Sequence, residues 1–336
     1  MSHSNSSLNC FASCMAKYEH NYILHTPPCK PVSKHLTFGV MAHDVMYKAG
    51  KLRDEVNDGV VDKEQYQSII PSEVLYNDLK QEFAIQSWTR YFTLVIKKTA
   101  EYEKHCMLEL AATGDVQIER ELKLQMTVDQ LKDIGVYGID QPIVGIIDCL
   151  LFTKTAAIIL DYKFSSARKS QDDFDMNSQL PLYAMMVHYL YDIPLHNIQY
   201  GYIDIPKQMC DEPVLLSNGT LSRSKSQNCT QDMYERAVTA IHGNDPKYNC
   251  EPGGYYYDAW CNMALNKPAY LSIQYLDEEV YAGVLKDLFD AACTIDTFIR
   301  NKMVFCKKYD SYSCGSCEYV NSCKPWRQVN NDTIES

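Results

Sequence analysis

Apolar and polar positions along the chain follow two different periods, which predicts a mixture of helices and strands. Apolar residues recur at helical spacing within the ranges 6–22, 38–47, 66–110, 179–191 and 276–299. Strand-like patterns occupy 116–124, 142–152, 156–163 and 198–205, and a short helix or loop is expected at 129–134. The pattern therefore predicts an α/β (α+β) fold with a mixed central sheet flanked by helices.

Residues from about 207 to 270 depart from this pattern, so we interpret them as an insertion. They are rich in Gly, Asn, Ser and Tyr, and their four cysteines have spacings that fit no common metal site. Free buried thiols are expected there. The chain is then a single domain, 1–336. Residues 1–110 form a mainly helical part, 111–206 the core, 207–270 the insertion, and 271–336 a C-terminal helix followed by the cysteines.

Two neighbouring apolar runs, 142–152 and 156–163, carry charged groups where strands are expected to be buried. These groups are Asp148, Asp161 and Lys163. Asp161 and Lys163 are two residues apart, so they face the same side of a strand. Two carboxylates on paired strands can hold a divalent cation, and a lysine beside them can position or activate water. A buried Asp–Lys ion pair, or strand-end residues facing solvent, is the alternative without a catalytic purpose.

Composition narrows the class of protein. The chain has 336 residues, 46% of them hydrophobic, and no apolar run reaches the 18 or so residues of a membrane span. We expect a cytoplasmic, reducing compartment, where 14 cysteines indicate a metal or cluster site rather than a disulfide framework. The net charge of −11 argues against general nucleic-acid binding but permits a nucleic-acid enzyme with a local basic track.

The C-terminal cysteines have the spacing of a metal or cluster site. Cys314 and Cys317 form a C-x2-C motif, and Cys323 follows closely. Such a tight loop presents two thiolates to one metal centre. A fourth ligand is required, and Cys14 and Cys306 are the two candidates.

Six motifs occur in a fixed order along the chain: SSLNCFASCMAKY, FGVMAH, GIID, DYK, QLPLY and CGSCEYVNSC. Together they resemble the RecB-like exonucleases of the PD-(D/E)XK nuclease superfamily, in the iron–sulfur branch that includes CRISPR-associated RecB-like exonucleases and AddB-type nuclease domains. The resemblance runs the length of the chain. It implies a restriction-endonuclease-like core with an N-terminal helical region and a C-terminal cysteine-cluster lobe.

The resemblance also implies a catalytic site. It places Mg²⁺ or Mn²⁺ on the side chains of His43, Asp148 and Asp161 and on the backbone carbonyl of Tyr162. Lys163 would orient the attacking water or stabilise the developing phosphorane charge. Gln179 and Tyr183 would support the site or contact the DNA strand. A further carboxylate on the preceding strand would be Glu119, with Glu121 as the alternative.

A structural 4Fe–4S cluster is the second implied cofactor. Its ligands would be Cys14, Cys314, Cys317 and Cys323, which would join the two ends of the chain. The family has a proline beside its opening cysteine, where this sequence has Met15, and this departure keeps Cys10 in consideration.

The implied activity is that of a metal-dependent deoxyribonuclease, an exonuclease acting on single-stranded DNA or DNA ends in recombination and repair. The chain has no helicase motif, so a helicase or a recombination or CRISPR-type partner would be a separate protein. Two other classes stay open. One is a catalytically inactive DNA-binding or assembly subunit, and the other is a protein with a structural zinc site that is unrelated to nucleases. The intact set of Asp148, Asp161 and Lys163 favours the enzyme.

Overall fold

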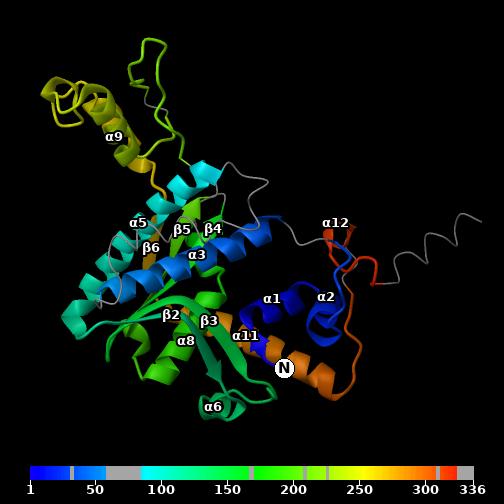
Figure 1. Ribbon diagram of the computed structural model, residues 1–336. Helices are drawn as coiled ribbons and strands as arrows, with labels where there is room; N and C mark the ends of the chain where they lie inside the picture. The colour runs from blue at the N-terminus through cyan, green and yellow to red at the C-terminus, as the bar shows by residue number, and fades with distance from the viewer. Residues whose placement is uncertain are drawn as a thin grey trace, which may run out of the picture.

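A mixed β-sheet forms the centre of the computed structural model, which describes residues 1–30, 34–57, 85–165, 170–206, 210–224, 227–307 and 311–323 (Figure 1). Its six strands within these ranges are β1 (His3–Ser4), β2 (Gln117–Met126), β3 (Ile143–Phe152), β4 (Ala157–Ser165), β5 (Ile198–Pro206) and β6 (Tyr270–Tyr275). The strand order is β1-β3-β4-β5-β6, and β2 pairs with β3. Strands β1 and β3, and β4 and β5, are parallel, and the other pairs are antiparallel.

Helices cover both faces of this sheet (Figure 1). On one face, α1 (Asn5–Ser13), α8 (Gln179–Tyr191) and α11 (Glu278–Arg300) contribute to the larger hydrophobic core. On the other face, α3 (Lys34–Asn57) and α5 (Ile85–Leu110) pack against β3 and β4 in a second core. The shorter helices are α2 (Met15–Tyr18), α6 (Val128–Asp133), α7 (Gln171–Asp175), α9 (Gln231–His242), α10 (Tyr257–Asn262) and α12 (Ser311–Ser316).

The predicted fold class is confirmed, because apolar β-branched runs form the buried strands and helical stripes form the covering helices. The two runs around Asp148 and Asp161 pair as antiparallel β3 and β4, joined by a short turn. The run at 179–191 forms α8 with the expected bounds. Of the predicted helical range 66–110, residues 66–84 lie outside the described residues.

The predicted single helix at 6–22 is wrong, because the chain is broken at Cys14. The backbone of Cys14 is extended, with φ −163° and ψ 111°, and it separates α1 from α2. The backbone N–H of Ala16 bonds the carbonyl of Cys306 at 3.1 Å. A π-helical turn, Glu19–Ile23, then follows α2. A long-range contact with the C-terminal region therefore replaces local helix continuity at Cys14.

The predicted insertion contains structure that the sequence pattern did not suggest. Its last residue, Tyr270, begins β6, which completes the central sheet as the antiparallel neighbour of β5. The preceding segment has a small core of its own around Tyr234 and Tyr256, between α9 and α10. Its thiols are mixed: Cys229 and Cys250 are buried, as expected, whereas Cys261 is exposed.

The chain start is held in the sheet by a buried polar contact. His3 in β1 is fully buried, and its Nε2 lies 3.0 Å from Oδ1 of Asp296 in α11. The other oxygen of Asp296 accepts a hydrogen bond from the backbone N–H of Asp140. This arrangement fixes β1 on the edge of β3. No helix in the described ranges is both long and apolar enough to cross a membrane.

Candidate active site

Strands β3 and β4 separate at the level of two aspartates. Their ladder ends at the Cys149–Leu160 pair, and the next position in register would join Asp148 to Asp161. In place of a further backbone pair, Oδ2 of Asp148 accepts a hydrogen bond of 2.9 Å from the backbone N–H of Tyr162. Beyond this point β1 pairs with β3, and β4 continues beside β5. We call this place the β3–β4 fork, and both carboxylates lie in it.

Asp161 is surrounded by three polar side chains that the sequence predicted for the site. It is 3% exposed, and its Oδ2 lies 2.5 Å from Nζ of Lys163. Gln179, the first residue of α8, donates to Oδ1 of Asp161 at 3.2 Å and to the hydroxyl of Tyr183 at 2.9 Å. The side-chain oxygen of Gln179, Oε1, accepts a hydrogen bond of 3.3 Å from Nζ of Lys163. The start of α8 therefore holds the Asp161–Lys163 pair.

His43 approaches the fork from α3. Its Nδ1 lies 3.4 Å from Oδ2 of Asp148, and its ring packs edge-on against Phe164 at 5.4 Å between centroids. Burial alone would lower the pKa of His43, but the hydrogen bond and charge of Asp148, together with the charge of Asp161, raise it above its ordinary value. His43 thus lies in the negative field of both carboxylates.

The two carboxylates repel each other in a poorly solvated place. Burial raises the pKa of Asp161 to about 6, the charge of Asp148 raises it as well, and Lys163 opposes both effects. A raised carboxyl pKa means that the charged form lacks sufficient positive partners. A divalent cation with oxygen ligands would supply that charge, so the donor chemistry of the fork fits Mg²⁺ or Mn²⁺.

The predicted three-ligand metal site is not assembled in this conformation. Among the described residues, no three His, Cys, Asp or Glu side chains are placed to share one ion. The oxygens of Asp161 contact Lys163 and Gln179, and Oδ2 of Asp148 contacts a backbone N–H and His43. These protein donors occupy the carboxylate oxygens that a metal ion would use.

Glu119 is not brought together with the other predicted residues. It is exposed on β2, and its charge acts on Tyr191 at the C-terminal end of α8, whereas Gln179 lies at the N-terminal end of that helix. Its alternative, Glu121, occupies the β2 position level with Asp148 and has a left-handed backbone, with φ 47°. Neither glutamate has a described contact with the fork.

The segments that carry the four predicted cluster cysteines are joined by backbone hydrogen bonds between the two ends of the described chain, but among the described residues no three of these thiols are placed to share one metal ion. Burial raises the pKa of Cys323, and the charges of Cys14, Cys317 and Cys314 raise it further. Burial raises the pKa of Cys10 to about 11, and the charges of Cys14 and Cys317 also raise it, so Cys10 is a further neighbour of these thiols. Cys306 is exposed and contacts this region through its backbone carbonyl.

Other contacts hold the first thirty residues against the C-terminal cysteine loop. Lys17 pairs with Glu318 at 3.1 Å, and the backbone N–H of Cys29 bonds the carbonyl of Glu318 at 2.8 Å. The rings of His20 and Tyr319 stack at 5.5 Å. These contacts join the two ends of the described chain next to the cysteines.

Sequence reasoning missed a buried ion cluster on the opposite face of the sheet, built around Glu103 and Arg120. A signal was present in the pattern itself. Arg120 falls on the apolar phase of β2, between Ile118 and Leu122, and Glu103 falls within the apolar stripe of α5. A charge in the apolar phase of a predicted element indicates a buried pair.

Comparison with known proteins gives the family. The family model of the PD-(D/E)XK nuclease superfamily matches residues 2–324. The chain belongs to this superfamily, which makes it a nuclease-type hydrolase, and nucleases of this kind generally use Mg²⁺ or Mn²⁺. No curated protein matches the chain.

Two solved structures show weak similarity to the chain. A candidate exonuclease from Eubacterium rectale aligns at 9% identity with a TM-score of 0.42, covering 92% of this chain and 84% of its own. The structure of SSO0001 aligns at 12% identity with a TM-score of 0.27, covering 84% of each chain. The family assignment therefore rests on the family model.

Neutralising Asp161 should stabilise the metal-free protein in a pH-dependent way. Because folding raises the pKa of this carboxyl from 3.8 to about 6, ionising it costs folding free energy as the pH rises through this interval. The stability of Asp161→Asn relative to the wild type should therefore rise by about 3 kcal/mol between pH 4 and pH values above 6. Urea unfolding in EDTA across this range measures the difference. The exposed control Asp129→Asn should show no such gain, and a pH-independent difference for Asp161→Asn would contradict the assignment.

Proposed function

We propose that the protein is a metal-dependent deoxyribonuclease that hydrolyses phosphodiester bonds at the β3–β4 fork. The observation that carries the proposal is the Asp161–Lys163 pair, held by Gln179 beside Asp148 in a poorly solvated place. Membership of a nuclease superfamily supports the same chemistry. We further propose that it acts as an exonuclease on single-stranded DNA or DNA ends, and that a separate helicase or recombination partner supplies unwound substrate.

The residues of the fork can be assigned roles in phosphodiester hydrolysis. A divalent cation between Asp148 and Asp161 would lower the pKa of a bound water and neutralise charge on the phosphate oxygens. Lys163 is 26% exposed at its side chain, so its ammonium can leave Asp161 and orient the water or contact the developing negative charge. Gln179, fixed by its bond to Tyr183, keeps both groups aligned.

His43 has two compatible roles in the proposal. As a neutral imidazole it would be a metal ligand, and as an imidazolium beside Asp148 it would contact a DNA phosphate. The backbone carbonyl of Tyr162 would be a further ligand. The N–H of the same residue already holds Asp148 in place.

We also propose that Cys14, Cys314, Cys317 and Cys323 hold a structural 4Fe–4S cluster. Support comes from the effect of Cys14, Cys314 and Cys317 on the pKa of Cys323 and from the contacts that join the two ends of the described chain beside them. Four thiolates are the usual ligand set of such clusters. The cluster would reinforce a junction that already exists, and its binding free energy would add to the stability of the fold.

Replacing either aspartate, Asp148→Ala or Asp161→Ala, should abolish cleavage of end-labelled DNA in Mg²⁺ or Mn²⁺ without unfolding the protein.

Lys163→Ala should lower kcat by about 10²–10³-fold with little change in the Mn²⁺ concentration that gives half-maximal activity, because Lys163 acts on water or the transition state. Asp129→Ala and Lys132→Ala remove an exposed Asp–Lys pair and serve as matched controls. Near wild-type cleavage by either fork variant would place the site elsewhere, and an inactive wild type would favour a silent DNA-binding subunit.

Iron analysis distinguishes the ligand sets. Cys14→Ser should lose iron and the absorption near 400 nm expected of such clusters, whereas Cys306→Ser should retain both, because the side chain of Cys306 is exposed and its carbonyl makes the contact with Ala16. Metal content of the two purified proteins is the measurement. Full iron in Cys14→Ser with loss in Cys306→Ser would reverse the assignment, and zinc in place of iron would replace the cluster with a structural zinc site.

A further inference from the structure

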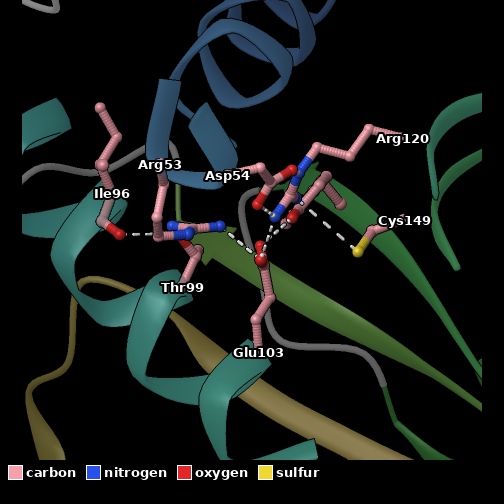
Figure 2. Close-up of polar contacts among 8 residues, drawn as sticks. Arg53, Asp54, Ile96, Thr99, Glu103, Arg120 and Cys149 are labelled. Carbon is pink, nitrogen blue, oxygen red and sulfur yellow. Dashed lines mark hydrogen bonds and ion pairs between the residues drawn. The ribbon is translucent and has the colours of Figure 1, made fainter. Parts of the chain in front are cut away.

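A buried ion cluster lies on the face of the sheet opposite the side chains of Asp161 and Lys163. It consists of two arginines and two carboxylates, Arg53 and Asp54 from α3, Glu103 from α5 and Arg120 from β2 (Figure 2). Arg120 donates to both oxygens of Asp54, at 2.7 and 3.1 Å, and to Glu103 at 2.7 Å, and Arg53 also pairs with Glu103. The side chains of Arg120 and Glu103 are each 3% exposed.

The charges of this cluster balance. Burial alone would raise the pKa of Glu103, but the charges of Arg53 and Arg120 lower it below its ordinary value, so the carboxylate stays ionised. A balanced buried ion cluster adds little net stability over apolar side chains, whereas removing one partner is costly. What such a cluster does provide is fixed geometry between the elements that meet in it.

The first connection from the cluster to the fork runs through Tyr162. Its hydroxyl donates to Oε1 of Glu103 at 2.5 Å on the cluster side of the sheet. Its backbone N–H donates to Asp148 on the fork side, and its chain neighbours are Asp161 and Lys163. Because side chains alternate along a strand, one residue contacts the cluster while the residues on either side of it face the fork.

The second connection runs through β3. Cys149 is fully buried, follows Asp148 directly, and its Sγ lies 3.8 Å from Nη1 of Arg120 (Figure 2). In β2, Arg120 is the register partner of Cys149. The guanidinium therefore packs against the strand position next to the fork carboxylate.

The third connection runs along α3, the helix that carries His43. Arg53 and Asp54 lie about three turns after His43 and bind the cluster. Gly50 permits the close approach, because a Cβ at this position would lie 2.6 Å from the guanidinium of Arg120. The cluster therefore fixes where α3, and with it His43, is seated on the sheet.

From these three connections we infer that the Arg53–Asp54–Glu103–Arg120 cluster positions the fork, with Tyr162 as the positioning residue for Asp148, Asp161 and Lys163. The inference rests on the proposed function only for its catalytic consequence. The mechanical claim stands apart from that function: losing the Tyr162–Glu103 bond loosens β4 at the fork while the fold persists.

Hydrogen exchange of the metal-free full-length protein tests the mechanical claim. Tyr162→Phe removes one hydroxyl and preserves the ring, so peptides covering 157–165 should exchange about tenfold faster, consistent with the loss of one buried hydrogen bond. Tyr234→Phe is the matched control, because its hydroxyl is equally buried and donates to the carbonyl of Ser222 within the insertion. Asp54→Asn should instead raise exchange in peptides of α3 that contain His43.

Steady-state kinetics on single-stranded DNA give the second readout. Tyr162→Phe should lower kcat about tenfold with KM within about twofold, because misplacing catalytic groups affects the transition state more than substrate binding. Tyr234→Phe should change neither constant. Unchanged exchange at 157–165 in Tyr162→Phe would overturn the inference whatever the kinetics show. An inactive wild type with faster exchange in Tyr162→Phe would contradict the proposed function and leave the positioning role established.

Discussion

The carboxylates of Asp148 and Asp161 are held close together in a place with little water, and much of the surrounding structure compensates for that. Each oxygen contact at the fork supplies positive charge or a donor: Lys163 and Gln179 to Asp161, and His43 and a backbone N–H to Asp148. Burial raises the pKa of Asp161 above its ordinary value, and the charge of Asp148 adds to this effect. A cation entering the fork would supply the positive charge that the two carboxylates lack.

The alternation of side chains along β4 lets one strand serve two purposes. Asp161 and Lys163 face the fork, whereas Tyr162 points between them to the buried ion cluster. The fork is therefore held in position by the charged side chains of the ion cluster, which take no part in the proposed chemistry. In the proposed mechanism, this division separates the groups that change partners from the groups that stay fixed.

The periodicity of apolar residues predicted the parts of the fold that are set by residues close together in the chain, such as the pairing of β3 with β4. The short turn after Phe152 fixes the register of β3 and β4, so the approach of Asp148 and Asp161 followed from the sequence. The pattern marks Arg120 as a charge in an apolar phase, but it does not identify Asp54, far away in the chain, as the partner of Arg120. The break at Cys14 likewise depends on a distant carbonyl, that of Cys306.

Glu119 illustrates a different limit. Both glutamates of β2 lie on its polar phase, and the alternation of a half-buried strand does not say how far along the sheet the active residues lie. The structure places Glu119 near the wrong end of α8 and Glu121 level with Asp148. Position along the strand, set by the pairing with β3, decides which residue is near the fork.

Crystals soaked in Mn²⁺ and measured at its absorption edge test the central claim most directly. Two carboxylates arranged to receive a cation should give an anomalous peak at the fork, with an oxygen of both Asp148 and Asp161 within about 2.0–2.6 Å of it. The Lys163 ammonium should then no longer contact Asp161. An intact Lys163–Asp161 pair without a peak at the fork, at Mn²⁺ concentrations that support cleavage, would contradict the account.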